Sequence, residues 1–178
     1  MKTLIKQMTA PVLREQAKHV KIEEIKTKKI QTILDKMKSA LKKEEDGVAI
    51  AAPQIGEGLR IFIISGRTIS IINNEGEDID KNIIYPDQVF INPIIKKLSK
   101  TKKKMEEGCL SVRWLYGQVE RSTKATIEAY DEHGKKFQKG ASGLMAQIFQ
   151  HEVDHLNGIL FIDKAENIEN IPPQKNAK

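Results

Sequence analysis

Two histidines and a glutamate near the C-terminus give the clearest chemical signal in the chain. They lie in the segment Gln150-His151-Glu152-Val153-Asp154-His155, and only four histidines occur in the whole sequence. Residues four apart on a helix share one face, about one turn from each other. His151 and His155 can therefore hold one divalent metal ion, and Glu152 can reach a water molecule on that ion. Asp154 either orients a histidine or faces solvent.

The single cysteine, Cys109, offers a third protein ligand. Catalytic zinc-type sites have three protein ligands and one open position. A lone cysteine is more often a small buried apolar residue, and Cys109 has no second cysteine for an internal disulfide. Taken together with the histidine motif, however, the segment Glu106-Glu107-Gly108-Cys109-Leu110-Ser111 predicts a thiolate ligand. Gly108 would let the backbone come close to the metal.

A third segment, Gly47-Val48-Ala49-Ile50-Ala51-Ala52-Pro53-Gln54, consists mainly of small residues. Its composition alone indicates a loop or tight packing. Gln54 is the exception, because a side-chain amide can donate a hydrogen bond to an oxyanion that develops during a reaction.

Two helices are expected to carry or support these residues. Apolar residues at helical spacing predict an amphipathic helix from Ile25 to Lys43, with Gly47 just beyond its end. A second helix is expected from Ser142 to Leu156. The Ser142 side chain would cap its start and Asn157-Gly158 would end it.

Strands are expected to outnumber the helices. Apolar or alternating runs predict strands at 59–64, 89–92, 123–130, 135–139 and 159–162, with a hairpin turn at 131–134. Pro93 should end the second of these strands or place it at a sheet edge, and residues 65–87 are expected to be polar, with a turn at 73–76. Hairpin-like connections indicate an α+β fold.

The size and composition suit one globular domain. The chain has 178 residues, of which 39% are hydrophobic and 30% charged, which excludes a disordered protein. We expect residues 1–165 to form a single catalytic domain and residues 166–178 a frayed tail. No stretch approaches the roughly 20 apolar residues that span a bilayer, and residues 1–10 lack a secretory apolar core. A cytoplasmic protein without a membrane partner is therefore expected.

The net charge of +6 is unevenly distributed, with six lysines between positions 96 and 104 (Lys96, Lys97, Lys100, Lys102, Lys103 and Lys104). A solvated loop or strand edge is the simpler interpretation. Attraction to a polyanion such as ribosomal RNA is the alternative. Because no aromatic residues alternate with the lysines, sequence-specific nucleic-acid readout is not expected.

Taken in their order along the chain (47–54, 106–111 and 150–155), the three segments resemble those of the peptide deformylase family. That family has a stretch similar to residues 47–54, then Glu-Gly-Cys-Leu-Ser, then Gln-His-Glu-x-Asp-His; Pro11-Val12-Leu13-Arg14 and Asn92-Pro93 are also similar. The resemblance implies an α+β fold with antiparallel sheets packed around a central metal-binding helix. It also implies a metal-dependent hydrolase that removes the N-formyl group from N-formylated nascent peptides and releases formate.

The resemblance also implies roles for individual residues. Cys109, His151 and His155 match the family's metal ligands, Glu152 its general acid and base, and Gln54 with the Leu110 N–H its oxyanion donors. Gly47, Ala49, Glu107 and Gly108 fall in its substrate-binding segments. The family usually contains Fe²⁺, with zinc, nickel or cobalt able to replace it. The ligand types alone would instead suggest zinc.

Two departures from the family pattern flank the expected cleft. Ala49 stands where glycine is usual, and Arg113-Trp114 stands where Pro-Gly is common. Both bear on substrate preference more than on the reaction, because neither replaces a metal ligand or the acid/base residue.

The spacing of the second helix adds a substrate prediction that is independent of the resemblance. Leu144, Ile148 and His151 are four and three residues apart and share one face. Leu144 and Ile148 would then line an apolar pocket for a methionine side chain. Alternatively, they only pack against the sheet.

Two other classes of protein remain to be weighed. A metalloprotease of the His-Glu-x-x-His type shares the helix motif but needs no upstream Glu-Gly-Cys element. An inactive binding module associated with the ribosome would not need Glu152 and Gln54. A Cys109→Ala variant that loses its metal would favour the deformylase interpretation over the protease.

Overall fold

A computed structural model describes residues 5–73 and 85–173 of the chain. Its α-helices are α1 (Lys28–Lys42), α2 (Gly66–Asn73) and α3 (Gly143–Leu156). Its strands are β1 (Ala49–Ala51), β2 (Ile61–Ile64), β3 (Gln88–Leu98), β4 (Lys102–Gly108), β5 (Leu115–Ser122), β6 (Lys124–Tyr130), β7 (Lys136–Ser142) and β8 (Glu166–Asn170). Four short 3₁₀ helices are η1 (Pro11–Arg14), η2 (Ile22–Glu24), η3 (Ala52–Ile55) and η4 (Phe161–Asp163).

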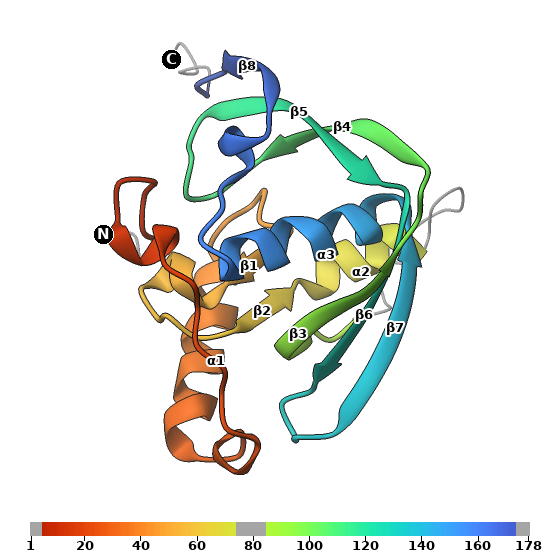
Figure 1. The fold of residues 1–178 in the computed structure, drawn as a ribbon. Helices are drawn as coiled ribbons and strands as arrows, with labels where there is room; N and C mark the ends of the chain where they lie inside the picture. Colours follow the sequence, from red (N-terminus) through yellow and green to blue (C-terminus); the bar gives the residue numbers. More distant parts are fainter. Residues whose placement is uncertain (1–4, 74–84, 174–178) are drawn as a thin grey trace.

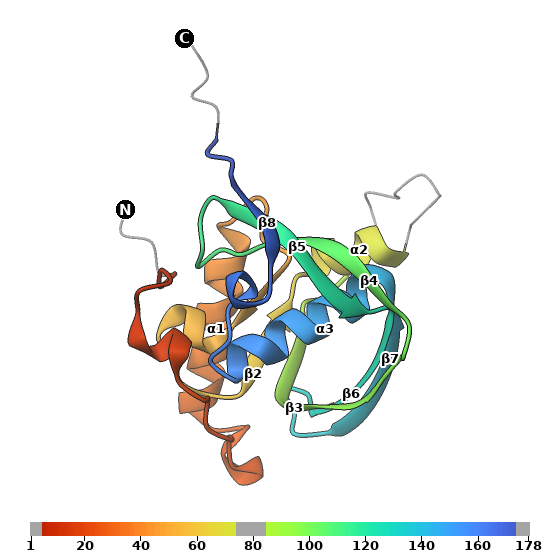
Figure 2. The ribbon, with the colours of Figure 1, turned by 45° about the horizontal axis from the view of Figure 1, so that its top comes forward.

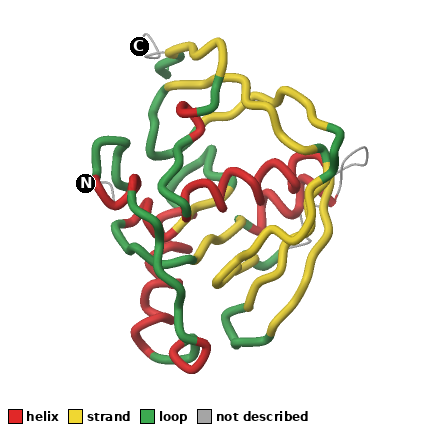
Figure 3. Tube along the Cα trace, viewed as in Figure 1, coloured by secondary structure: helices red, strands yellow, loops and turns green. Residues whose placement is uncertain are grey.

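The strands form two antiparallel sheets with α3 between them (Figure 1). One sheet has the order β1-β2-β3-β6-β7 and the other the order β4-β5-β8. Figure 2 shows α3 passing beneath β4 and β5 from a second direction, and Figure 3 shows how strands enclose this helix. The predicted α+β class, with antiparallel sheets around a central helix, is confirmed.

Helices cover both faces of the five-stranded sheet, which explains its continuous apolar strands. Ile61 and Ile63 of β2 pack in one core with the apolar face of α1. Phe62 and Ile64, which alternate with them, pack in a second core with Phe149 and other residues of α3. Antiparallel strands usually alternate between apolar and polar residues when one face meets water. Here both faces are buried, so the run 61–64 contains only apolar residues.

The α3 helix is fixed along its length rather than by a cap. Ser142 stands at the predicted N-cap position, but its side chain makes no capping hydrogen bond, so that part of the prediction is wrong. Gly158 has φ of 75°, the left-handed conformation expected where the chain leaves a helix. In the middle of the helix, the Gln150 amide donates to Ser122 O (2.9 Å) and accepts from Ser122 N–H (3.0 Å). These bonds hold α3 against β5.

The prediction for Pro93 is wrong, because β3 continues past it to Leu98 and lies inside the sheet. The pairing of β3 with β6 shifts register between Ile91 and Ile94, so Pro93 sits at an irregularity. Such bulges leave a residue outside the ladder, where a missing N–H costs little. Asn92, with φ of 52°, stabilises the bend by bonding to both backbone groups of Val20.

Three further expectations need correction. Residues 66–73 form α2 although no helix was expected in this polar segment, and residues 161–163 form η4 where a strand was expected. Residues 166–170, expected to be frayed, form β8 and pair with β5. Residues 74–76 of the expected turn and residues 174–178 of the expected tail lie outside the described residues. None of the helices in the described ranges has the length and hydrophobicity that a membrane span requires.

Candidate metal centre and pocket

Cys109, His151 and His155 come together at the point where β4 ends above α3. Their ligand atoms all lie within 4.8 Å of one another, and Cys109 Sγ is 3.2 Å from His155 Nε2. Metal–ligand bonds of about 2.0–2.3 Å in a tetrahedral site would place neighbouring ligand atoms about 3.5 Å apart. One soft thiolate and two imidazoles at this spacing fit a divalent transition metal.

A buried chain of charges fixes the orientation of His151. Its Nδ1 lies 2.8 Å from a carboxylate oxygen of Glu107, which leaves Nε2 free to face the metal position. Arg121 in turn donates two hydrogen bonds to Glu107, at 2.7 and 3.0 Å. Burial would raise the pKa of Glu107, but hydrogen bonds from His151 and Arg121 outweigh it and lower the pKa to about 2. Glu107 is therefore an anion suited to holding the imidazole.

Arg121 is the functional residue that sequence reasoning missed. It is only 4% exposed and joins Glu107 to Asp154, whose carboxylate it reaches at 2.6 Å. Asp154 also bonds to Lys164. Asp154 was expected either to orient a histidine or to face solvent. Its carboxylate instead binds two basic residues, Arg121 and Lys164. No sequence signal distinguishes a buried arginine in β5 from an exposed one, since its partners lie on other elements.

The electrostatics of the cluster favour a thiolate. Burial disfavours the ionised form of Cys109, but attraction from His155 and hydrogen bonds from both histidines dominate and lower its pKa to about 5. A cysteine ligand must be deprotonated to bind a metal. The site thus presents its sulfur in the form that a metal requires.

Glu152 lies next to the ligands without being one of them. It is 4% exposed and lines the pocket, and its Oε2 has no hydrogen-bond partner among the described residues. Burial raises its pKa above the usual value for a carboxyl. A carboxylate with a raised pKa and an uncommitted oxygen is well suited to accepting and returning a proton.

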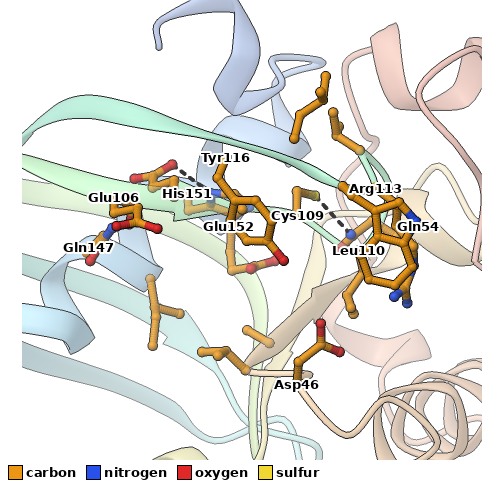
Figure 4. Close-up of a pocket in the computed structure, with 18 of the residues that line it drawn as sticks. Asp46, Gln54, Glu106, Cys109, Leu110, Arg113, Tyr116, Gln147, His151 and Glu152 are labelled. Carbon is orange, nitrogen blue, oxygen red and sulfur yellow. Dashed lines mark hydrogen bonds and ion pairs between the residues drawn. The ribbon is translucent and has the colours of Figure 1, made fainter. Parts of the chain in front are cut away.

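Gln54 presents its amide to the same site from η3. Its Oε1 accepts a hydrogen bond from Ala51 N–H at 2.8 Å, which fixes the amide's orientation. Its Nε2 then points to Ser111 Oγ at 3.2 Å and to Cys109 Sγ at 3.5 Å. Figure 4 shows Gln54 and Leu110 side by side near the sulfur. The amide nitrogen therefore lies beside the candidate metal cluster, where an amide N–H is able to donate to an oxyanion.

A cavity of about 290 Å³ opens beside the cluster. Leu144 and Ile148 of α3 both line it, as do Ala49, Arg113 and Trp114. Its other lining residues are Asp46, Val48, Gln54, Glu106, Glu107, Gly108, Cys109, Leu110, Val112, Leu115, Tyr116, Gln147, His151 and Glu152.

Three residues with expected substrate roles have structural roles as well. Glu107 lines the cavity, but its carboxylate binds His151 and Arg121. Gly108 faces Tyr116, whose ring would lie 2.7 Å from an added Cβ, so the close approach is to a side chain. Gly47 is not among the described residues that line the cavity, and an added Cβ there would meet Leu41 at 2.9 Å.

Comparison with known proteins agrees with this geometry. Residues 2–170 match the family described as polypeptide deformylase. The peptide deformylase of Desulforudis audaxviator is 37% identical over 92% of this chain and 94% of its own length. Peptide deformylase 1A of Arabidopsis thaliana, chloroplastic/mitochondrial, is 39% identical over 86% of this chain, which spans 58% of the plant protein.

A solved structure extends the comparison to three dimensions. The class I type b peptide deformylase from Acinetobacter baumannii, with Met-Ala-Ser bound, has a TM-score of 0.76 and 31% identity to this chain. The match covers 90% of this chain and 97% of that one. A Cys/His/His cluster beside a cavity, in a chain that matches the family over nearly its whole length, leads to one conclusion: this chain belongs to the peptide deformylase family.

Proposed function

We propose that this chain is a metal-dependent peptide deformylase, which hydrolyses the N-formyl group of newly synthesised polypeptides and releases formate. The observation that carries the proposal is the convergence of Cys109, His151 and His155 with an uncommitted Glu152 carboxylate at one end of the cavity. The third ligand comes from the Glu-Gly-Cys segment, which a metalloprotease of the His-Glu-x-x-His type does not need.

The residues of the chain would divide the reaction between them. When bound, a divalent ion would supply Lewis-acid chemistry, lowering the pKa of a water molecule towards neutrality. Glu152 accepts the proton of the attacking water and then passes it to the departing amine. Gln54 Nε2 and the Leu110 N–H donate to the oxyanion as the formyl carbon becomes tetrahedral. Through its hydrogen bond to His151, Glu107 keeps that imidazole in the required orientation.

Ferrous iron is the metal that we assign to the site, with zinc, nickel or cobalt as replacements. This assignment rests on the family resemblance, because a Cys/His₂ ligand set by itself suits zinc. A ferrous thiolate site is oxidisable. Purification in air should therefore inactivate an iron enzyme but not a zinc enzyme.

We expect this protein to discriminate strongly at the first residue of its substrate. Leu144 and Ile148 line the cavity on the α3 face that carries His151, and Ile148 is 5% exposed. Burying a methionine side chain there should contribute about 1.5–3 kcal/mol. In a formate-release assay, kcat/KM for formyl-Met peptides should exceed that for formyl-Ala peptides by about tenfold or more.

The Ile148→Asp variant should remove most of this preference. Ile94→Asp, on the half-exposed part of β3, is a matched control that should keep it. Equal efficiency on formyl-Met and formyl-Ala peptides would place the methionine pocket elsewhere. No formate release from either peptide would contradict the proposed function itself.

A cytoplasmic enzyme acting near the ribosome is the setting that we propose. The six lysines lie at the end of β3, in the following turn and on β4, and all of them are exposed. Ion pairs join Lys102 to Glu120 and Lys104 to Glu166. Attraction to ribosomal RNA would be independent of sequence and sensitive to salt. Co-sedimentation with ribosomes at low salt that is lost at high salt would support this contact; no co-sedimentation at low salt would exclude it.

A further inference from the structure

Two separate chain segments form facing walls of the cavity. One runs from the end of α1 into β1 and contributes Asp46, Val48 and Ala49; the other runs from the end of β4 into β5 and contributes residues 109–116 except Ser111. Because β1 belongs to the five-stranded sheet and β4 and β5 belong to the three-stranded sheet, no strand pairing joins the two walls. Their spacing must be set by other contacts.

An ion pair crosses between the two segments. Arg113 donates to Glu44 with 2.5 Å between Nη2 and Oε2, and the two side chains are only 23% and 19% exposed. A partly buried pair is screened less by water and salt than an exposed one. The guanidinium also lies 5.1 Å from the centre of the Trp114 ring. Arg113 therefore binds both the opposite segment and the aromatic residue of its own wall.

Hydrogen bonds from other elements hold the backbone on both sides of this ion pair. Arg67 of α2 donates to the backbone oxygens of Glu44 at 2.7 Å and Glu45 at 3.2 Å. On the other side, Trp114 O accepts a hydrogen bond from Ile171 N–H at 2.9 Å, just beyond β8. The pair thus connects two supported loops, so its loss would change the distance between walls rather than release a free side chain.

Neither residue of the ion pair belongs to the cluster of Cys109, His151 and His155. Figure 4 shows Arg113 on the other side of Cys109 from Glu106 and Gln147. Glu44 is not one of the described residues lining the cavity. The α3 side, with Leu144 and Ile148, is the proposed place for methionine. The residues of the peptide that come after methionine would then extend along the wall that carries Arg113 and Trp114.

We infer that the Arg113–Glu44 ion pair, here called the clasp, sets the distance between the two chain segments at the cavity opening. It thereby determines the affinity of the protein for the peptide residues that follow methionine. Trp114, held beneath the guanidinium, would be the surface on which that part of the peptide packs. This inference rests on the proposed function. It makes Arg113 and Glu44 positioning residues, because neither touches the reacting atoms.

A comparison of long and short substrates tests the clasp. In Arg113→Ala and Glu44→Ala, KM for formyl-Met-Ala-Ser should rise about five- to twentyfold, with a much smaller change in kcat. KM for formyl-methionine amide, which has no following residues, should change much less. Because both variants break the same ion pair, the double variant should be no worse than Arg113→Ala alone, which also loses the contact with Trp114.

Two further variants separate the clasp from a general loss of structure. The charge reversal Glu44→Arg with Arg113→Glu should recover most of the lost affinity, and Arg113→Lys should recover part of it. Lys38→Ala breaks the partly buried pair between Lys38 and Glu132, neither of which lines the cavity, and should leave KM unaltered, as a matched control. Metal content and thermal midpoint should be measured for every variant.

Equal increases in KM for the long and short substrates, or additive effects in the double variant, would overturn the clasp. Binding of Met-Ala-Ser, measured by calorimetry, gives a readout that needs no turnover. Weaker binding in Arg113→Ala would support the clasp even if no formate were released. An unchanged dissociation constant together with normal deformylation would refute the clasp and leave the proposed function intact.

Discussion

Replacing any one of the three proposed metal ligands should abolish both metal binding and deformylation. Cys109→Ala and His151→Ala each leave two ligands, whereas catalytic sites of this kind have three protein ligands. Elemental analysis after anaerobic purification should give about one divalent ion per chain in the parent protein and a value near zero in the variants. Activity should fall beyond the roughly 10⁴-fold upper end for loss of a general base, because activation of water is lost as well.

The chain provides a matched control for this experiment. His133→Ala removes an exposed histidine from the turn between β6 and β7 and should retain both metal and activity. A Cys109→Ala protein that kept its metal would favour a site of the metalloprotease type. Iron in the anaerobic sample and its loss of activity in air would identify the metal, whereas stable zinc would contradict the ferrous assignment.

Glu152→Gln should lower kcat by about 10²–10⁴-fold while the metal stays bound. The amide has nearly the same shape as the carboxyl but cannot accept a proton, so a loss of this size would isolate the proton transfer. Metal binding should persist because Glu152 is not one of the three converging ligands. The measurement is steady-state formate release together with metal content on the same preparation.

A second glutamine substitution provides the control for Glu152. Glu120→Gln changes a carboxylate that is 58% exposed on β5 and should have no measurable effect on kcat. Near-parental turnover in Glu152→Gln would remove Glu152 from the mechanism. Loss of metal in that variant would instead mean that Glu152 supports the ligands, and the fall in activity could not be assigned to proton transfer.

Local periodicity explains why some elements could be predicted. The helix expected at 25–43 is α1 at Lys28–Lys42, and the one expected at 142–156 is α3 at Gly143–Leu156. Each has its apolar residues on one face, and that pattern depends only on residues within the helix. The hairpin of β6 and β7 was also predictable, because the turn residues between these strands are adjacent in sequence.

Two features that differ from the prediction depend on partners far away in the sequence. Residues 166–170 are all exposed and polar apart from Ile168, so nothing in their composition predicts that β8 pairs with β5. Similarly, β3 passes through Pro93 because Asn92 bonds to Val20, 72 residues earlier. Composition describes a segment by itself, whereas these segments are ordered by contacts with others.

Local sequence was enough to place His151, Glu152 and His155 on one helix, with the two histidines on one face, because the helical period brings positions i and i+4 together. Three contacts could be seen only in the folded chain: Cys109 with His155, Arg121 with the Glu107 that holds His151, and Arg113 with Glu44. Each of these contacts joins different elements, and their distances exist only after α3 has been packed between the two sheets.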